Sequence, residues 1–381
     1  MLIAKNDAQQ MISSHEAVKS ETYYCPCCQN EVVLKKGKIK FPHFAHKTLS
    51  NCEATSEPET LEHLKGKSLI ARNCATFGLA YELEVYLPEI NQRADVLIQN
   101  KLAIEFQCSS LSIERLIERT TQYKKHDYQV FWVLGSRLGT QKHLTELKKH
   151  FIYFDCFRGY IDFCLLVEDN LLVVTYYLFS KNKKIVTRKK QFSLGEISLV
   201  NILTECGLKT EYLIQQPFEE MLNRRKQLSD QLLCSDNIVK DLQEYFYQHN
   251  LHLAHLPPYL YFPNFFHPLL RGEDIRIRWL TFEVLQNKKM LTYRELQQDV
   301  LENLPPEAMD DYANLGKHQV FDYCLSLYVS FLQEIKVVKL SGSNMLCFDE
   351  ESVMNNEQFK KFFKKRSERL TLPLKYDMII K

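Results

Sequence analysis

Several residue types and patterns are scarce or missing in this 381-residue sequence. Gly (11) and Pro (12) are few, which excludes collagen-like and low-complexity chains. Neither sign of charge dominates, because 49 basic and 47 acidic residues leave a net charge of +2. A nucleic-acid surface would therefore need local segregation of charge. No apolar run approaches the length of about 18 residues that would predict a membrane span. The composition is that of an ordinary globular protein, with 45% hydrophobic and 25% charged residues.

The N-terminus also lacks the apolar core of a signal peptide, since it turns polar after four residues. We therefore expect a cytoplasmic protein whose 12 cysteines are reduced, with any closely spaced group of them a candidate metal site. At about 100–200 residues per domain, the length predicts two or three domains.

The order of predicted elements indicates an α/β layer followed by a helical region. A helix is expected over 56–77, with Ser56 as its N-cap. The elements expected after it are strands over 80–87, 93–98 and 102–107, a helix over 112–126, a strand over 129–134 and a helix over 141–150. Hairpins are expected over 151–192, and mainly helices from about residue 196. This pattern predicts four segments: 1–53, 54–155, 156–195 and 196–381.

Cysteines and histidines near the N-terminus have the spacing of a zinc site. Cys25 and Cys28 are followed, after a gap of fourteen residues, by His43 and His46, and such a gap is typical of two-Cys, two-His centres. Cys27 competes with Cys28 as a ligand, and the His-x2-His spacing is tighter than usual. Four protein ligands would leave no open position, so the predicted Zn²⁺ is structural. The alternative is a pair of buried cysteines and two histidines in turns.

Carboxylates gather on the hairpin that follows the first predicted helix. Asp95 lies in one strand, and Glu105 and Gln107 lie on one face of the next. A tight hairpin would bring Asp95 beside Glu105, and such oxygen ligands suit Mg²⁺ or Mn²⁺. The helix would bring Glu59 or Glu62, and His63, towards them. A solvated acidic hairpin is the alternative.

These residues occur in an order that resembles the CoiA family of competence proteins, which carries a PD-(D/E)XK-type nuclease core. The resemblance is firm over about residues 20–160. It is carried by Cys25-Pro26-Cys27-Cys28, Pro42-His43-Phe44-Ala45-His46, Glu62-His63-Leu64 with Lys67, Arg93-Ala94-Asp95-Val96, Ile104-Glu105-Phe106-Gln107-Cys108-Ser109, Arg119-Thr120 with Tyr123, and Val130-Phe131-Trp132-Val133-Leu134-Gly135.

The resemblance implies a restriction-endonuclease-like α/β fold. It would have a mixed sheet flanked by helices, a small N-terminal zinc-finger-like module and a helical C-terminal domain. It also implies a metal-dependent DNA endonuclease, or nuclease-like factor, of natural transformation. Asp95 and Glu105 would bind Mg²⁺ or Mn²⁺, and Gln107 with an acid of the first helix would position water. Gln107 stands where the pattern usually has Lys, so the resemblance leaves full nuclease activity in doubt.

The expected partners are DNA, single-stranded or branched, and recombination or DNA-uptake proteins. The zinc-like module and the C-terminal domain would grip the DNA backbone. The lysine and arginine run over 181–190 and the Phe–Lys tail over 359–366 are further candidate DNA contacts. A solvated hairpin face is the usual explanation of such a charge run, and an amphipathic helix with its Phe residues packed inward is the favoured interpretation of the tail. A non-catalytic recombination accessory protein is the alternative function, and a general DNA-repair nuclease is a third.

Overall fold

The structure is a computed structural model whose chain divides into two compact units. Unit 1 comprises residues 1–151, 162–175 and 189–208, and unit 2 comprises residues 152–161, 176–188 and 209–381. The structure describes residues 1–37, 40–47, 52, 59–155, 158–181, 184–204, 214–217, 219–234, 237–261, 267–268, 270, 274–341, 345–365 and 369–372. None of the helices within these ranges has the length and apolarity needed to cross a membrane.

The N-terminal part of unit 1 is a small antiparallel sheet. Its strands, in the order β2-β1-β3-β4-β5, are β1 (Ile3–Lys5), β2 (Met11–Ser13), β3 (Tyr23–Tyr24), β4 (Glu31–Lys35) and β5 (His43–His46). Alternation buries Val32 and Leu34 of β4 beneath Phe44 of β5. Tyr23 packs against Phe44, with ring centroids 5.0 Å apart. This core is small, and a bound metal would compensate for its size.

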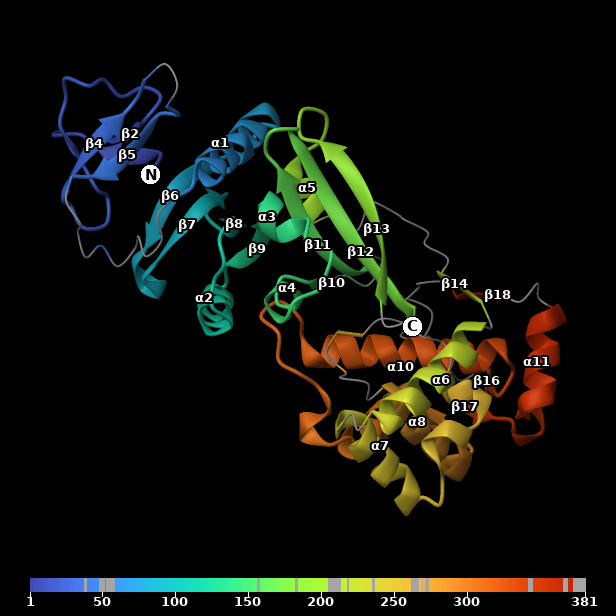
Figure 1. Ribbon diagram of the computed structural model, residues 1–381. Coiled ribbons are helices and arrows are strands. Elements are labelled where there is room, and N and C mark those ends of the chain that lie inside the picture. The colour runs from blue at the N-terminus through green and yellow to red at the C-terminus, as the bar shows by residue number, and fades with distance from the viewer. Residues whose placement is uncertain are drawn as a thin grey trace. The chain divides into compact units, whose positions relative to one another are not determined.

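A larger mixed sheet flanked by helices follows the N-terminal sheet along the chain (Figure 1). Its strands, in the order β13-β12-β11-β9-β8-β7-β6 with β10 paired to β11, are β6 (Tyr81–Leu87), β7 (Gln92–Ile98), β8 (Leu102–Gln107), β9 (Gln129–Leu134), β10 (Tyr153–Asp155), β11 (Gly159–Leu166), β12 (Leu171–Lys181) and β13 (Lys184–Ser193). The three strands β6, β7 and β8 pair antiparallel, as the sequence predicts, and β9 pairs parallel to β8 and to β11.

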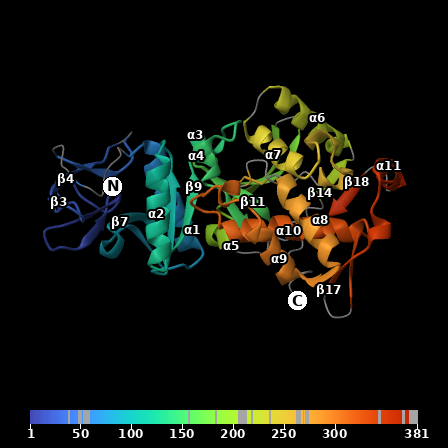
Figure 2. The same cartoon turned by 90° about the horizontal axis from the view of Figure 1, so that it is seen from below.

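Helices α1 (Leu61–Thr76) and α2 (Ile113–Lys125) cover opposite faces of this sheet (Figures 1 and 2). Phe106 packs against Gly66 of α1, whereas its neighbour Glu105 contacts Tyr123 of α2, because successive strand residues face opposite sides. The side chain of Thr60 caps α1 by accepting the N–H of His63. The helix therefore begins later than expected, and the predicted N-cap Ser56 lies outside the described residues.

Two further sequence expectations need correction. The helix predicted over 141–150 is two single turns, α3 (Ser136–Gly139) and α4 (Glu146–Lys149). The second correction concerns the helical region, which also contains short strands. Its elements are α5 (Leu199–Thr204), β14 (Ile214–Pro217), α6 (Glu219–Leu233), α7 (Asn237–Gln248), α8 (Asp274–Lys288), β15 (Met290–Thr292), α9 (Tyr293–Glu302), α10 (Lys317–Glu334), β16 (Val338–Leu340), β17 (Met345–Phe348), α11 (Asn356–Lys365) and β18 (Arg369–Leu372).

The segment from α8 to β17 in unit 2 has a recognisable topology. Its elements follow the order helix, strand, helix, helix, strand, strand, and its antiparallel sheet has the order β15-β17-β16. This is the topology of a winged helix. In the tail, α11 buries Phe359, which packs against Phe331 of α10. At this position the amphipathic helix, rather than an exposed base-stacking surface, describes the Phe–Lys pattern.

The contact between α1 and β8 depends on the missing side chain of Gly66. A Cβ atom there would lie 2.0 Å from Cε1 of Phe106, whose ring is buried beside His63. We predict that Gly66→Ala lowers the free energy of unfolding by about 1–3 kcal/mol, because overpacking outweighs the better helix propensity of Ala. The exposed Arg72→Ala on the same helix should change it by no more than about 0.5 kcal/mol.

Urea unfolding followed by tryptophan fluorescence measures this difference. The sequence has two tryptophans, Trp132 in unit 1 and Trp279 in unit 2, so a Trp279→Phe background confines the signal to unit 1. A more stable Gly66→Ala protein would show that α1 does not pack this closely on β8.

Candidate functional site

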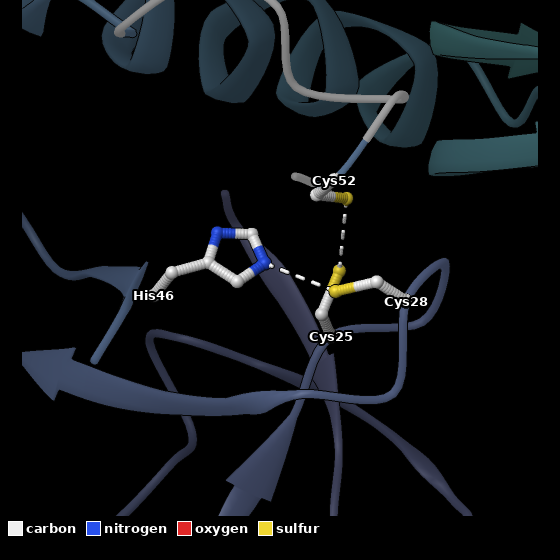
Figure 3. Close-up of side chains that lie close together, drawn as sticks. All are labelled: Cys25, Cys28, His46 and Cys52. Carbon is white, nitrogen blue, oxygen red and sulfur yellow. Dashed lines mark hydrogen bonds between the residues drawn. The ribbon is translucent and has the colours of Figure 1, made fainter. Parts of the chain in front are cut away.

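Three cysteines and one histidine converge in the N-terminal module (Figure 3). Cys25 and Cys28 lie in the turn after β3, His46 ends β5, and Cys52 completes the group, with all four ligand atoms within 4.8 Å of one another. The sulfurs of Cys25 and Cys52 are 3.9 Å apart, and the sulfur of Cys28 is 3.4 Å from Nε2 of His46. Ideal tetrahedral zinc bonds would place these pairs about 3.8 and about 3.6 Å apart. The donor set therefore fits Zn²⁺.

Metal binding would require Cys25 to lose its thiol proton. Its hydrogen bond with Cys27 and its burial raise the pKa of the Cys25 thiol to about 12. A bound cation would favour the thiolate and so couple metal binding to the folding of the module.

This group differs from the sequence prediction at one ligand. His43 and His46 are three positions apart on β5, so their side chains lie on opposite faces of the strand. Nδ1 of His43 is 2.8 Å from the carbonyl oxygen of Phe41, and Cys52 takes the fourth place. Of the two competing cysteines, Cys28 belongs to the group, and Cys27 is hydrogen-bonded to Cys25. The tight His-x2-His spacing was the one sequence signal that a histidine of this pair is replaced, and Cys52 is the next cysteine along the chain.

Asp95 lies in a buried network of charges between α1 and strands β6 and β7. Its Oδ2 is 3.0 Å from Nε2 of His63 and accepts the N–H of Phe106 at 2.9 Å. The Nζ of Lys67 is 3.9 Å from Oδ1. Burial alone would raise the pKa of Asp95, but the attraction of His63, its hydrogen bond and Lys67 hold that pKa well below its usual range. Asp95 is therefore ionised at neutral pH.

The ammonium group of Lys67 is the centre of this network and is fully buried. It donates to Oε1 of Glu59 at 2.6 Å and to Glu84. Glu84 also accepts the N–H groups of Leu2, at 2.8 Å, and Ile3, at 3.2 Å, so this acid links the N-terminal sheet to β6. Burial would lower the pKa of Lys67, but the attraction of Glu84, Glu59 and Asp95 outweighs burial and raises it.

The sequence did not indicate Glu84 as part of this network, because its backbone conformation departs from that of a regular strand. Glu84 has a φ of +54°, in the left-handed region that non-glycine residues rarely adopt. Strand alternation does not predict the face of a residue with this backbone. Its carboxylate is buried, and despite that burial the attraction of Lys67 lowers its pKa to about 2.

The two candidate acids of the first helix have different surroundings. Glu59, just before α1, contacts Lys67, lies 3.5 Å from Nη2 of Arg93 and 3.9 Å from Nδ1 of His63. Glu62, in the first turn of α1, accepts the N–H of Ser136 at 2.7 Å and so caps α3. The structure therefore places Glu59 in the network of Asp95, and Glu62 at the end of β9.

Glu105 lies next to Asp95 along the hairpin but is contacted from the other helix. Val96 pairs with Ile104, so Asp95 and Glu105 are the next residues along the two antiparallel strands. Oε1 of Glu105 accepts the hydroxyl of Tyr123 at 2.5 Å and Nη2 of Arg119 at 2.7 Å. Burial raises the pKa of Glu105, Arg119 opposes that rise, and repulsion from Asp95 adds to it. The two carboxylates are therefore close enough to repel each other.

Gln107 lies at the end of β8 and is almost fully buried. Its Nε2 donates to the carbonyl oxygen of Ser109 at 3.0 Å, and its backbone pairs with Leu134 of β9. Arg119 stacks over the ring of Trp132, 5.0 Å from its centroid, which fixes the guanidinium beside Glu105. Asp95, Glu105 and Gln107 thus lie around the point where β7 and β8 stop pairing.

Two family models match this chain, one of a nuclease-like domain and one of an N-terminal domain. A model described as a nuclease-like domain matches residues 59–206, and a model of an N-terminal domain matches residues 5–55; both describe the competence protein CoiA. Together they cover more than half of the sequence, and the chain belongs to the CoiA family.

One curated relative is the competence protein CoiA of Bacillus subtilis (strain 168), which is 33% identical over 158 residues. The match covers 39% of this chain and 42% of that protein, so the chain matches less than half the length of this relative. No solved structure matches the chain.

We predict that the protein purifies with one Zn²⁺ per chain, and that the two histidines of β5 differ in their effect. His46→Ala and Cys52→Ser should lose the metal, whereas His43→Ala should retain it, because His43 lies on the other face of the strand. The zinc-to-protein ratio from inductively coupled plasma mass spectrometry checks this. A loss of zinc from His43→Ala, with retention in Cys52→Ser, would contradict the ligand set.

We also predict that two lysines of α1, Lys65 and Lys67, differ sharply in their contribution to stability. Lys67→Met leaves Glu59 and Glu84 buried without their cation and should lower the free energy of unfolding by about 3–5 kcal/mol. Lys65→Met removes a surface pair with Glu168 and should cost no more than about 1 kcal/mol. Urea unfolding followed by Trp132 fluorescence, in the Trp279→Phe background, compares them. Equal effects would show that the network does not depend on Lys67.

Proposed function

We propose that this protein is a metal-dependent DNA endonuclease, or a nuclease-like factor, that acts on incoming or recombining DNA during natural transformation. Under this proposal the predicted segment 54–155, most of which lies in the nuclease-like match, is a PD-(D/E)XK-type core. The protein would work in the cytoplasm, with recombination or DNA-uptake proteins as partners, and its N-terminal module would hold a structural Zn²⁺.

The observation that carries the proposal is the pair of buried carboxylates, Asp95 and Glu105, at the end of the β7–β8 hairpin of a nuclease-like domain. Each is held in place by donors. The N–H of Phe106 and His63 orient Asp95, and Tyr123 and Arg119 orient Glu105. The pKa of Asp95 is lowered and that of Glu105 is raised, and two adjacent buried acids perturbed in opposite directions support a functional site.

The pair fits a hard divalent cation by its chemistry, because both groups offer carboxylate oxygens. Burial and repulsion from Asp95 raise the pKa of Glu105, and a cation between the two acids would remove that repulsion. Asp95 and Glu105 would hold Mg²⁺ or Mn²⁺, which supplies charge stabilisation at a phosphodiester and a more acidic water.

The remaining side chains would position the reacting groups. Lys67, fixed by its contacts with Glu59 and Glu84, would stabilise the charge of Asp95. His63 would orient the same carboxylate. Gln107 would position water through its amide, but it brings no positive charge to the phosphate. In this arrangement the cations nearest the acids are Lys67, His63 and Arg119, and they come from the two flanking helices.

A non-catalytic accessory role is favoured by one observation. Gln107 replaces the usual lysine, and Asp95 and Glu105 already have protein cations as partners. A protein that kept the fold but bound DNA without cutting it would keep the same contacts, because they also stabilise the core.

Cleavage of labelled single-stranded, duplex and branched DNA separates the two functions. With Mg²⁺ or Mn²⁺, we expect cutting that EDTA abolishes and that Asp95→Ala and Glu105→Ala each reduce by about a hundredfold or more. Glu118→Ala is the matched control, since this exposed acid of α2 forms a surface ion pair with Arg115. It should leave cleavage unchanged.

Folding of each variant is checked by tryptophan fluorescence before activity is compared. The absence of cutting on every substrate by the wild-type protein, with DNA binding unaffected by Asp95→Ala and Glu105→Ala, would overturn the nuclease proposal in favour of the accessory role.

A further inference from the structure

A cavity of about 250 Å³ lies in unit 1 at the carboxyl end of β9, beside α3 and α4. Its apolar lining comes from Leu134, Leu138 and Phe151, all of which are buried. Exposed polar residues, including Arg137 and Gln141, form its rim. Pockets with an apolar floor and a few polar groups at the rim are typical of small-molecule sites.

The cavity adjoins the candidate nuclease site through the backbone of the sheet. Leu134 pairs with Gln107 across strands β8 and β9, and Ser110, three positions after Gln107, also lines the cavity. Glu62 caps α3 at Ser136, next to Arg137. In α/β sheets, ligands bind outside the carboxyl ends of parallel strands, and β8 and β9 form such a parallel pair.

The charge of the lining favours an anion. Arg137 and Lys148 line the cavity, and none of the described lining residues is acidic. Lys148 is buried, donates to the carbonyl oxygen of Gly139 at 2.9 Å and lies 3.6 Å from Asp162, so its contacts hold α3 near α4. The exposed guanidinium of Arg137 remains at the rim, where its planar donors suit a phosphate.

The volume sets an upper limit on the ligand. About 250 Å³ is below the range of about 300–1,000 Å³ that is usual for drug-sized ligands. An enclosed duplex is therefore excluded, whereas a single base with its phosphate matches both the size and the division into apolar floor and cationic rim.

We propose that this cavity binds one unstacked nucleotide of the DNA strand, with its base against the apolar part of the cavity and its phosphate at Arg137. The proposal deepens the proposed function and rests on it for the identity of the ligand as DNA. A base can enter such a pocket only after it leaves the helical stack, which costs least in single-stranded or frayed DNA. The cavity would therefore give the protein a preference for single-stranded DNA over duplex.

The test fills the mouth of the cavity from an exposed position. Gln141→Trp places an indole at the rim, and Lys142→Trp, at the neighbouring exposed position outside the cavity lining, is the matched control. Binding of thymidine 5′-monophosphate, and of fluorescent single-stranded and duplex oligonucleotides, is measured at one fixed salt concentration without divalent metal. We expect Gln141→Trp to weaken binding of the monophosphate and of the single strand by about tenfold or more, and Lys142→Trp to have no effect.

A second pair of variants tests the phosphate. Arg137→Ala should weaken binding of thymidine 5′-monophosphate but not of thymidine, and Lys142→Ala should change neither. The proposal is overturned if the wild-type protein does not bind the monophosphate, or if the variants of Gln141 and Lys142 behave alike.

Failure of this proposal and failure of the nuclease proposal have different signatures. If Gln141→Trp leaves both metal-dependent cutting and nucleotide binding unchanged, the nucleotide-binding proposal is wrong and the nuclease proposal stands. If the protein cuts no DNA but binds the nucleotide, and Gln141→Trp abolishes that binding, the nucleotide-binding proposal is supported and the nuclease proposal is wrong.

Discussion

The buried ammonium group of Lys67 is the interaction on which the rest of unit 1 depends. Removing a charge from water costs several kcal/mol, and the cost is offset here only because Glu59 and Glu84 surround the ammonium and Asp95 lies 3.9 Å away. These partners come from the segment before α1, from β6 and from β7, so one side chain fixes three parts of the fold. Glu84 then extends the network to the backbone of Leu2 and Ile3. The acid site and the N-terminal module are thus held by the same charges.

Arg93 connects this network with the cysteine and histidine group. Its Nη2 lies 3.5 Å from Glu59. The hydrogen bond with Cys25 lowers the pKa of Cys27 and burial lowers that of His46, and the Arg93 guanidinium lowers both further. The Nη1 of Arg93 is buried without a hydrogen-bond partner among the described residues. A Cys3His zinc centre carries a net charge of −1, and a nearby guanidinium offsets such a charge. With zinc bound, the arginine between the two sites would stabilise both and so hold the small module against the nuclease-like domain.

The sequence was most informative where local patterns decide the structure, and least informative where distant or unusual contacts do. The hairpins of β6, β7 and β8 follow from alternation and short turns, and they bring Asp95 beside Glu105 as expected. His43 is not a ligand, because strand alternation places its side chain on the opposite face from that of His46. Cys52 was not predicted, because it lies beyond β5 and outside the motif. The left-handed backbone of Glu84 and the single turns α3 and α4 have no periodic signal. The cavity could not be predicted, since its lining comes from four separate segments.

The winged-helix segment of unit 2 invites a comparison with DNA-reading domains, but its chemistry argues otherwise. A recognition helix lays an exposed polar face in the major groove. Here α10 occupies that place in the topology, yet Val320, Phe321 and most of the residues that follow are buried on every side of the helix. Lys317, at its first turn, already pairs with Asp311 at 2.9 Å. This helix is the core of its unit, and it gives no support to the expectation that the C-terminal domain grips the DNA backbone. Under the proposed function the DNA contacts would lie in unit 1, at Arg137 and at the carboxyl ends of β8 and β9, where Gln107 pairs with Leu134.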